Sequence, residues 1–342
     1  MKHMPRLDAL RGLAVLAVLV YHFGPRLPIS GALGVQLFMV LSGFLISSIL
    51  LEMKARELPL GKCLKKFYMR RAFRIFPLFY VVFAIGCVLA LPGFRKYWPY
   101  HLFYASNFPS VHSGGVGTVG HFWSLAVEEQ FYLLWPLVLI VIPWKKLPAI
   151  MVGFGVVACA YRLWVESGQP LHFYYLLPAS FDYFALGGLL ALRPYISSVE
   201  RWTRPLSDWR VLNGLIIVAL CCGRAGVYSP CGYRFCLGLI FAGVIARCAD
   251  GTGWRILDSC CLQYLGRISY GIYLYHLPVI GLISLHVPID WTGSWSGFLW
   301  KTATTLCVAI PSYHFFEKPI NDLKDKPIQF WSRRIEYSQA TP

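Results

Sequence analysis

The sequence predicts an all-α polytopic membrane protein with about ten transmembrane helices and both termini in the cytoplasm. Of its 342 residues, 57% are apolar and only 14% are charged, and the mean hydropathy is +0.54. Soluble domains carry about 25% charged residues, so this composition excludes an ordinary cytosolic enzyme. A net charge of +16 could suggest nucleic acid as a partner. The basic residues, however, lie between apolar runs rather than on one soluble face. The expected partner is therefore the lipid bilayer, and no nucleic-acid partner is expected.

The predicted helices are runs that approach the 20 or so apolar residues needed to cross the hydrocarbon core. The seventh and eighth runs are the weakest, because Arg224 and Arg234 interrupt them. In chain order, the runs cover 7–24, 33–52, 74–92, 121–143, 148–166, 172–192, 211–228, 234–249, 264–286 and 297–317.

The basic residues predict the orientation of these helices. With a cytoplasmic N-terminus, 25 of the 32 lysines and arginines fall in inner segments and seven in outer segments or flanking turns. Such an excess follows the positive-inside rule. An even number of spans then returns the C-terminus to the cytoplasm.

One membrane domain is expected, covering 1–320, followed by a short cytoplasmic tail at 321–342. The first apolar run lacks a small-residue cleavage site and is typical of an uncleaved first helix. No linker rich in proline, glycine or serine leads to a fused extracytoplasmic domain. The 11 cysteines include no CxxC pair or His/Cys spacing suited to zinc, so no metal site is expected.

The first predicted helix carries two ionisable residues, Arg11 and His22. Eleven residues of helix turn through about 1100°, so both share one face about 16 Å apart. An ionisable group within a span is costly and therefore suggests function. The alternative is that Arg11 is an anchor paired with Asp8 and that His22 is an interfacial residue beside Tyr21.

The fourth predicted helix begins HFWSLAVEEQFYLLWP and contains two adjacent carboxylates, Glu128 and Glu129, which cannot both face lipid. His121 lies two turns before Glu128 on the same face, and Ser124 lies one turn before it. A histidine near a carboxylate can act as a general base, so His22 with Glu128 is a candidate pair. A structural hydrogen bond between helices is the alternative.

An arginine cluster precedes the third predicted helix, where Arg70, Arg71 and Arg74 lie at the cytoplasmic mouth. Guanidinium groups bind phosphate in a bidentate manner, so the cluster suits a multiply phosphorylated ligand. Ordinary anchoring under the positive-inside rule is the alternative. The ninth predicted helix places Arg267 inside and His276 about 13 Å deeper.

These strings, in sequence order, resemble the membrane-bound acyltransferases of the acyltransferase-3 family. The resemblance covers essentially the whole chain. Its strings are LDALRGLAVLAVLVYHF at 7–23, GVQLFMVLSGFLI at 34–46, RRAFRIFPLFY at 70–80, HFWSLAVEEQFYLLWP at 121–136, LGRISYGIYLYHLP at 265–278 and FFEKPIN at 315–321.

The resemblance implies a ten-helix enzyme of the inner (cytoplasmic) membrane that transfers an acyl group, usually acetyl, from acyl-CoA. The usual acceptor is a hydroxyl of a cell-envelope or exported glycan or of a glycosylated small molecule. Some members carry a fused extracytoplasmic hydrolase-like domain. Because none is expected here, the protein should act alone or pass its acyl group to a separate partner.

Residue roles follow by combining the resemblance with the residue chemistry. The catalytic candidates are His22 as general base, Glu128 and Arg11, and the candidates for the CoA phosphates are Arg70, Arg71 and Arg74. The substrate-binding candidates are Trp123, Ser124, Glu129, Tyr132 and His276. Trp123 and Tyr132 would stack on sugar rings, although aromatic residues also form membrane-interface belts. An acyl-enzyme on histidine or on Ser42 or Ser124 is an alternative to direct transfer.

The main rival is a multi-pass transporter or flippase in which the buried histidine, glutamate and arginine residues relay ions or substrate. Transporters tend to show paired repeats with helices broken at matching positions. The two halves of this chain show no such self-similarity. A non-catalytic membrane anchor is a third hypothesis, and it leaves His22 and Glu128 unexplained.

Overall fold

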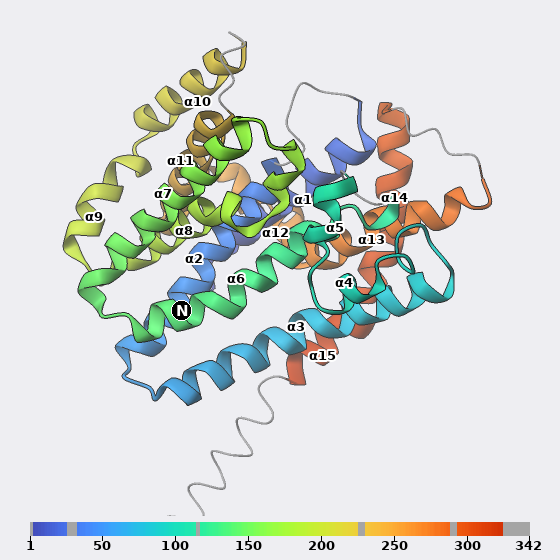
Figure 1. Cartoon of the computed structure of the whole chain (residues 1–342), viewed down its shortest axis with the longest axis horizontal. Helices are drawn as coiled ribbons and strands as arrows, with labels where there is room; N and C mark the ends of the chain where they lie inside the picture. The colour runs from blue at the N-terminus through green and yellow to red at the C-terminus, as the bar shows by residue number, and fades with distance from the viewer. Residues whose placement is uncertain (1–2, 26–32, 114–116, 225–229, 288–292, 324–342) are drawn as a thin grey trace, which may run out of the picture.

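The computed structural model describes residues 3–25, 33–113, 117–224, 230–287 and 293–323, which form α-helices and short helical turns with no β-strand (Figure 1). The α-helices are α1 Pro5–Phe23, α2 Leu33–Ala55, α3 Leu60–Val88, α4 Trp98–Leu102, α5 Asn107–Ser113, α6 Phe122–Val141, α7 Leu147–Glu166, α8 Phe181–Leu192, α9 Ser197–Thr203, α10 Trp209–Arg224, α11 Pro230–Ala249, α12 Cys260–Arg267, α13 Ser269–Ser284, α14 Trp295–Ser312 and α15 Lys318–Asp322.

The all-α prediction for a multi-pass membrane protein agrees with these elements. Five helical stretches are long and apolar enough to cross a membrane: Leu33–Ala55, Leu60–Val88, Gly117–Val141, Trp144–Glu166 and Cys231–Ala249. Each of the ten predicted segments contains helix, but the count of ten spans and the cytoplasmic termini stay predictions. Of the predicted tail, 324–342 lies outside the described residues.

Two predicted segments are not single helices. The segment 172–192 starts with the 3-10 turns Leu171–Tyr175 and Leu177–Ser180, and α8 begins only at Phe181. The segment 264–286 is divided at Ile268, where α12 ends and α13 begins. Gly266 of α12 packs so closely on α1 that a Cβ there would lie 1.7 Å from the carbonyl oxygen of Asp8. α12 therefore lies along α1, and the chain turns before α13.

The centre of the bundle is the packing of α2 against α8. A Cβ on Gly187 would lie 2.2 Å from the carbonyl oxygen of Val40, and one on Gly43 would lie 2.3 Å from that of Phe184. Small residues at helix crossings allow backbones in a membrane to approach this closely. The outer helices instead expose large apolar side chains such as Leu133, as expected of surfaces that face lipid.

A buried ion pair joins α7 to the start of α8. Arg162, predicted to flank an outer turn, lies inside the bundle with no exposed side-chain surface, as does Asp182. Its guanidinium donates to both carboxylate oxygens of Asp182, at 2.9 and 2.5 Å, and to the carbonyl of Ala179. A buried charge is tolerated only when it is paired and hydrogen-bonded in this way.

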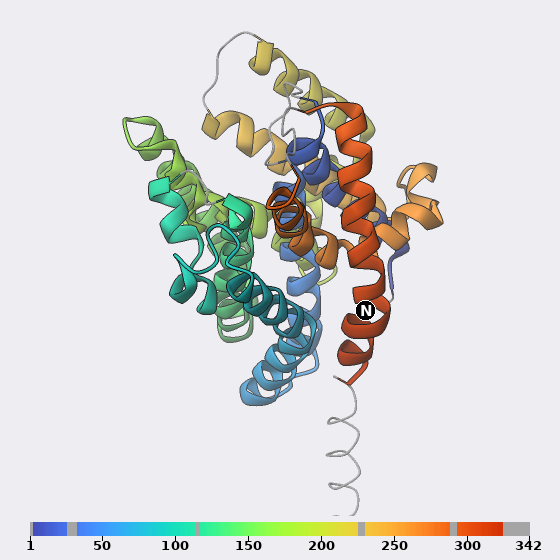
Figure 2. The same ribbon diagram turned by 90° about the vertical axis from the view of Figure 1, so that its right-hand side faces the viewer.

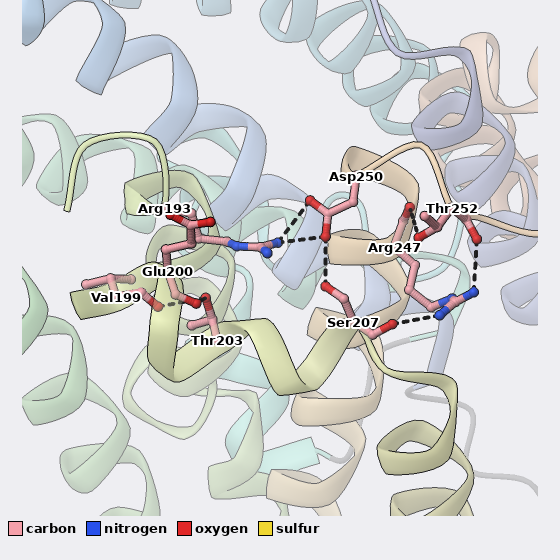
Figure 3. A network of polar contacts seen from close by, with 8 residues as sticks. All are labelled: Arg193, Val199, Glu200, Thr203, Ser207, Arg247, Asp250 and Thr252. Atoms are coloured by element: carbon pink, nitrogen blue, oxygen red, sulfur yellow. Dashed lines mark hydrogen bonds and ion pairs between the residues drawn. The ribbon is translucent and has the colours of Figure 1, made fainter. Parts of the chain in front are cut away.

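A polar network ties the end of α8 to the end of α11 (Figure 3). Asp250 accepts hydrogen bonds from Arg193, at 3.2 Å, and from Ser207, at 2.9 Å. Arg247 donates to the carbonyls of Ser207 and Thr252. All of these residues belong to segments predicted to be cytoplasmic, where water and polar contacts are available.

The last helices run end to end along one side of the bundle (Figure 2). A π-helical turn at Tyr313–Glu317 joins α14 to α15 without an interruption. π-helical turns widen the backbone and re-aim the following side chains. Here the turn carries Glu317, whose carboxylate oxygen would lie 2.6 Å from a Cβ on Gly271. The turn Tyr313–Glu317 thus packs directly on α13.

Candidate functional site

A cavity of about 290 Å³ lies between α1, α2, α3, α6 and α13. It brings together seven of the residues that the sequence singled out: Arg11, Arg71, Arg74, Ser124, Glu128, Glu129 and Tyr132. Its other polar lining residues are Asp8, Ser42, Tyr104, Ser269, Tyr270 and Tyr273. Three separate helices, α1, α3 and α6, supply these seven residues, so the cavity exists only in the folded bundle.

Glu128 is one end of a hydrogen-bonded chain within this cavity, which continues through Tyr132 to Ser42. Tyr132 is one helical turn further along α6, and its hydroxyl donates to Oε2 of Glu128 at 2.8 Å. The same hydroxyl lies 3.1 Å from Oγ of Ser42 on α2. The guanidinium of Arg71 lies over the Tyr132 ring, 4.5 Å from its centre. This arrangement fixes the Tyr132 ring between a cation and a carboxylate.

Positive and negative groups meet in the cavity. Arg71, Arg11 and Arg74 are the charges that act most on Glu128. Arg71 and Arg74 come from α3, and each lines the cavity together with Glu128. Arg71 and Arg74 therefore line a cavity inside the bundle. Their role as ligand-binding residues stays a prediction.

Three further cavities have lining residues in common with the first one. Arg11 and Arg74 also line a cavity of about 230 Å³ that contains Arg267 and Lys318. Arg71 and Arg74 border another of about 170 Å³ together with Arg70. Arg70 in turn lines a cavity of about 440 Å³ near the start of α1. Basic side chains therefore line adjoining cavities at the predicted cytoplasmic end.

Arg267 and Lys318 were not among the residues predicted to bind a ligand. Each had a signal in the sequence, because each is a cation at the predicted inner end of an apolar segment. That signal does not distinguish an anchor from a binding residue. Only the folded chain brings α12 and α15 to the same cavity as α3.

A second cluster consists of three histidine rings. The ring centres of His22 and His276 are 5.0 Å apart, and those of His121 and His276 are 4.5 Å apart. His276 has no exposed surface. Its Nδ1 lies 2.6 Å from the carbonyl oxygen of Tyr273, whereas its Nε2 has no hydrogen-bond partner among the described residues. Predicted residues from α1 and α13 thus meet around one buried imidazole.

Two hydroxyl groups separate the cavity from the histidine cluster. The hydroxyls of Ser124 and Tyr273 both line the cavity and lie 2.5 Å apart. Each also donates to the backbone carbonyl of His121, at 3.1 Å from Ser124 and 3.0 Å from Tyr273. The wall between the two sites is therefore one layer of side chains thick at this point.

The pairing expected between His22 and Glu128 differs from the contacts observed. Glu128 receives its hydrogen bond from Tyr132, and the imidazole beside His22 is that of His276. The reason is depth, because Glu128 lies seven residues, or about 10 Å, beyond His121 along the chain. His22 is at the level of His121. No hydrogen bond among the described residues supports an orienting role for Glu128 toward His22.

Trp123 belongs to a group of aromatic rings in contact with one another. Its ring centre is 4.8 Å from that of Tyr175, and Tyr175 is stacked on His172 at 6.0 Å. Tyr175 and His172 belong to the 3-10 turn before α8, inside a segment predicted to be a regular span. The sequence contains no local signal for this contact, because it joins residues about 50 positions apart.

The charged residues that line the adjoining cavities include several guanidinium groups. Among the parts of the chain that the structure describes, no group of three or more His, Cys, Asp and Glu side chains is arranged to hold a metal ion. Three arginines and three carboxylates line the first cavity, and three arginines are the charged lining of the cavity of about 170 Å³.

Comparison with known proteins adds a family to this geometry. A family model described as "Acyltransferase domain" matches residues 4–314. The "Peptidoglycan O-acetyltransferase OatA" of Listeria monocytogenes is 31% identical over 97% of this chain and 60% of its own length. The "Putative peptidoglycan O-acetyltransferase YrhL" of Bacillus subtilis is 30% identical over 98% of this chain and 57% of its own length.

A protein of Staphylococcus aureus, "Putative O-acetyltransferase SAR0937", is 26% identical over 98% of this chain. The chain spans 57–60% of the length of these three relatives. No solved structure matches it. Since the family model covers nearly all of the helical bundle, including the arginine-lined cavity and the histidine cluster, this chain belongs to the acyltransferase-3 family of membrane-bound acyltransferases.

Proposed function

We propose that this protein is an O-acyltransferase of the inner (cytoplasmic) membrane. It moves an acyl group, acetyl in the simplest case, from cytoplasmic acyl-CoA to a hydroxyl of a cell-envelope glycan. The observation that carries this proposal is the arginine-lined cavity, which ends one side-chain layer away from His121 and His276, and His276 in turn lies beside His22. The arginines at one end of this arrangement would bind the anionic donor, and the histidines at the other end would supply the general base.

The donor assignment rests on charge and shape. Acyl-CoA carries several phosphate charges at one end and a thin, flexible arm that ends in a thioester. Arg70, Arg71 and Arg74 border adjoining cavities where guanidinium forks can bind phosphate oxygens. The arm would then extend past Glu128 and Tyr132 toward the histidine cluster. Arg11, which lines two of these cavities, adds a further cation.

The acceptor assignment rests on the relatives and on the aromatic side chains. The relatives from Listeria monocytogenes and Bacillus subtilis carry peptidoglycan O-acetyltransferase in their names. Trp123, on the helix that carries Glu128 and Glu129, and Tyr175 present a pair of rings tilted by 34° to each other. Aromatic rings of this kind pack well on the apolar face of a sugar. A glycan hydroxyl reaching His22 is the acceptor that fits both observations.

The transfer uses His22 as the general base. His22 removes the proton of the acceptor hydroxyl while its oxygen bonds to the acyl carbon. The carbon–sulfur bond then breaks, and CoA leaves as a thiolate that takes the proton from His22. The products are an ester and CoA with a free thiol, so no other reactant is consumed. Glu128 accepts a hydrogen bond from Tyr132 and so fixes the Tyr132 ring under the guanidinium of Arg71, in the cavity that would hold the arm of the donor.

The test is mass spectrometry of envelope glycans and exported glycosylated products from strains that differ only in this protein. One strain lacks the gene, and others carry the wild type, His22→Ala or His286→Ala. His286 is an exposed histidine beyond α13 and serves as the matched control. We expect the mass of one acyl group on a product in the wild type and His286→Ala strains only.

The result also identifies the acceptor and the acyl chain. Equal acylation in the His22→Ala strain, with the variant present in the membrane, would remove His22 from the mechanism. Identical products in all strains, together with no turnover of acetyl-CoA by the purified protein, would overturn the proposed function.

A further inference from the structure

We propose that His276 positions His22 by accepting a hydrogen bond from its ring N–H, a role that the sequence suggested for Glu128. This inference rests on the proposed function, in which His22 is the base. It makes His276 a positioning residue, because its ring acts through His22.

The hydrogen bonds of His276 determine which of its nitrogens carries the proton. A backbone carbonyl can only accept, so Nδ1 must donate its hydrogen to the carbonyl of Tyr273, 2.6 Å away. In a neutral imidazole the other nitrogen is then an acceptor. Nε2 of His276 is therefore a bare acceptor, fully buried and without a partner among the described residues.

An acceptor in this state is costly to leave unsatisfied. Nearly all buried polar atoms in proteins have a hydrogen-bond partner, and an unpaired one costs about 1–3 kcal/mol. The polar ring on α1 that lies next to His276 is that of His22. The ring of His121 is also adjacent, 4.5 Å from His276 centre to centre, and both of its nitrogens lack a partner among the described residues. The 5.0 Å spacing of His22 is the one that fits a hydrogen bond between two imidazoles, so we assign the donor to an N–H of His22.

The distance between the two rings permits this bond. Ring nitrogens lie about 1.1 Å from the centre of an imidazole, and hydrogen bonds from nitrogen span about 3 Å, so bonded rings have centres about 5 Å apart. The centres of His22 and His276 are 5.0 Å apart, with the rings tilted by 50°. Hydrogen bonds at catalytic sites are often loose without substrate and tighten when it binds.

Neighbouring rings hold His276 in place. His121 lies 4.5 Å away and Phe23 lies 6.0 Å away, centre to centre.

A hydrogen bond from one nitrogen of His22 leaves its other nitrogen unprotonated, which is the state that a general base requires. The neutral imidazole of His276 can accept this hydrogen bond without bringing a charge into the buried site. A carboxylate in its place would have to be buried as an anion, at a large cost in desolvation free energy.

Two conservative substitutions separate this role from a structural one. In His276→Gln, the amide oxygen can reach the position of Nε2 and accept from His22. In His276→Asn, the shorter amide reaches only the position of Nδ1 and can bond to the Tyr273 carbonyl. If His276 has only a structural role, the His276→Asn variant should be the more active of the two. If His276 positions His22, the His276→Gln variant should be the more active.

The assay measures kcat and the KM for acetyl-CoA with the full chain in liposomes and the acceptor found by mass spectrometry. We expect His276→Asn to lower kcat about 100-fold with little change in that KM, and His276→Gln to keep at least ten times the kcat of His276→Asn. Equal rates for the two variants, or a faster His276→Asn, would overturn the inference while leaving acyl transfer by the wild type established.

A second measurement uses the unsubstituted protein, so it does not depend on how the variants fold. The ring nitrogens of ¹⁵N-histidine-labelled protein in liposomes are observed by magnetic resonance at pH 8, and the signals of His22 are assigned from their loss in His22→Ala. We expect one tautomer of neutral His22. An equal mixture of both tautomers would contradict a fixed hydrogen bond to His276.

Discussion

Arg71 makes two kinds of contact in the donor cavity. It is stacked on the ring of Tyr132, and its guanidinium is one of the cations that line the cavity. Tyr132 is also held by hydrogen bonds to Glu128 and Ser42, so it keeps its place without Arg71. Loss of Arg71 should therefore remove a ligand contact more than a structural one.

We expect Arg71→Ala to raise the KM for acyl-CoA at least tenfold, because a charge-assisted hydrogen bond contributes about 1.5–3 kcal/mol. The KM for the acceptor should change little. Steady-state kinetics in liposomes with each substrate varied in turn measure both values. Lys62→Ala removes a cation from the exposed first turn of the same helix and is the matched control. An equal rise in both KM values would assign Arg71 to folding of the site instead.

At the scale of the elements, sequence periodicity predicted where helices occur better than where they break. The break at Ile268 depends on the contact of Gly266 with the backbone of α1. In the sequence, Gly266 and the charged Arg267 interrupt the apolar run at this point, but neither residue indicates the contact with α1. The late start of α8 likewise depends on the packing of the turn Leu171–Tyr175 under Trp123. Tertiary contacts between distant segments accompany both differences, and Pro178 in the turn Leu177–Ser180 is a local signal for the second one.

The crossing of α2 and α8 gives a prediction about stability. Gly187→Val should destabilise the protein by about 1–3 kcal/mol or more, because its Cβ would lie 2.2 Å from the backbone of α2. Thermal unfolding of the detergent-purified protein, followed by loss of the monodisperse peak, measures the effect as a lower Tm.

Gly155→Val on α7 is the control for this substitution. No atom lies within 4 Å of a Cβ at Gly155, so only the helix propensity changes, by a few tenths of a kcal/mol in favour of valine. Its Tm should match or slightly exceed that of the wild type. Equal Tm values for the two variants would show that α2 and α8 are not packed this closely.

At the scale of the whole molecule, the sequence predicted the residues of the site but not all of their partners. Pairs on one helix follow from the 3.6-residue period, as Glu128 and Tyr132 illustrate. Contacts between helices do not, because they depend on rotation and depth in the bundle. The meeting of His22 with His276, more than 250 residues apart, is such a contact. For the same reason Glu128 was expected beside His22 and instead faces Arg71 and Tyr132.

The orientation of the whole bundle is the remaining prediction, and it decides whether the arginines face cytoplasmic acyl-CoA. Positive charge favours the cytoplasmic side for the segments that contain Arg70, Arg71 and Arg267. The exposed Cys260 and Cys261 at the start of α12 are natural reporters for that side. Phe103, 76% exposed beside α4, lies in a segment predicted to be outside.

A membrane-impermeant maleimide applied to cells carrying Phe103→Cys should therefore label position 103 directly. It should label Cys260 and Cys261 only after the membrane is permeabilised, with labelled peptides identified by mass spectrometry. The reverse pattern would place the arginine-lined cavities on the outer side, where acyl-CoA is not made. In that case the guanidinium groups would have to serve an anionic substrate from outside the cell, and the transporter hypothesis would account for them better than acyl transfer does.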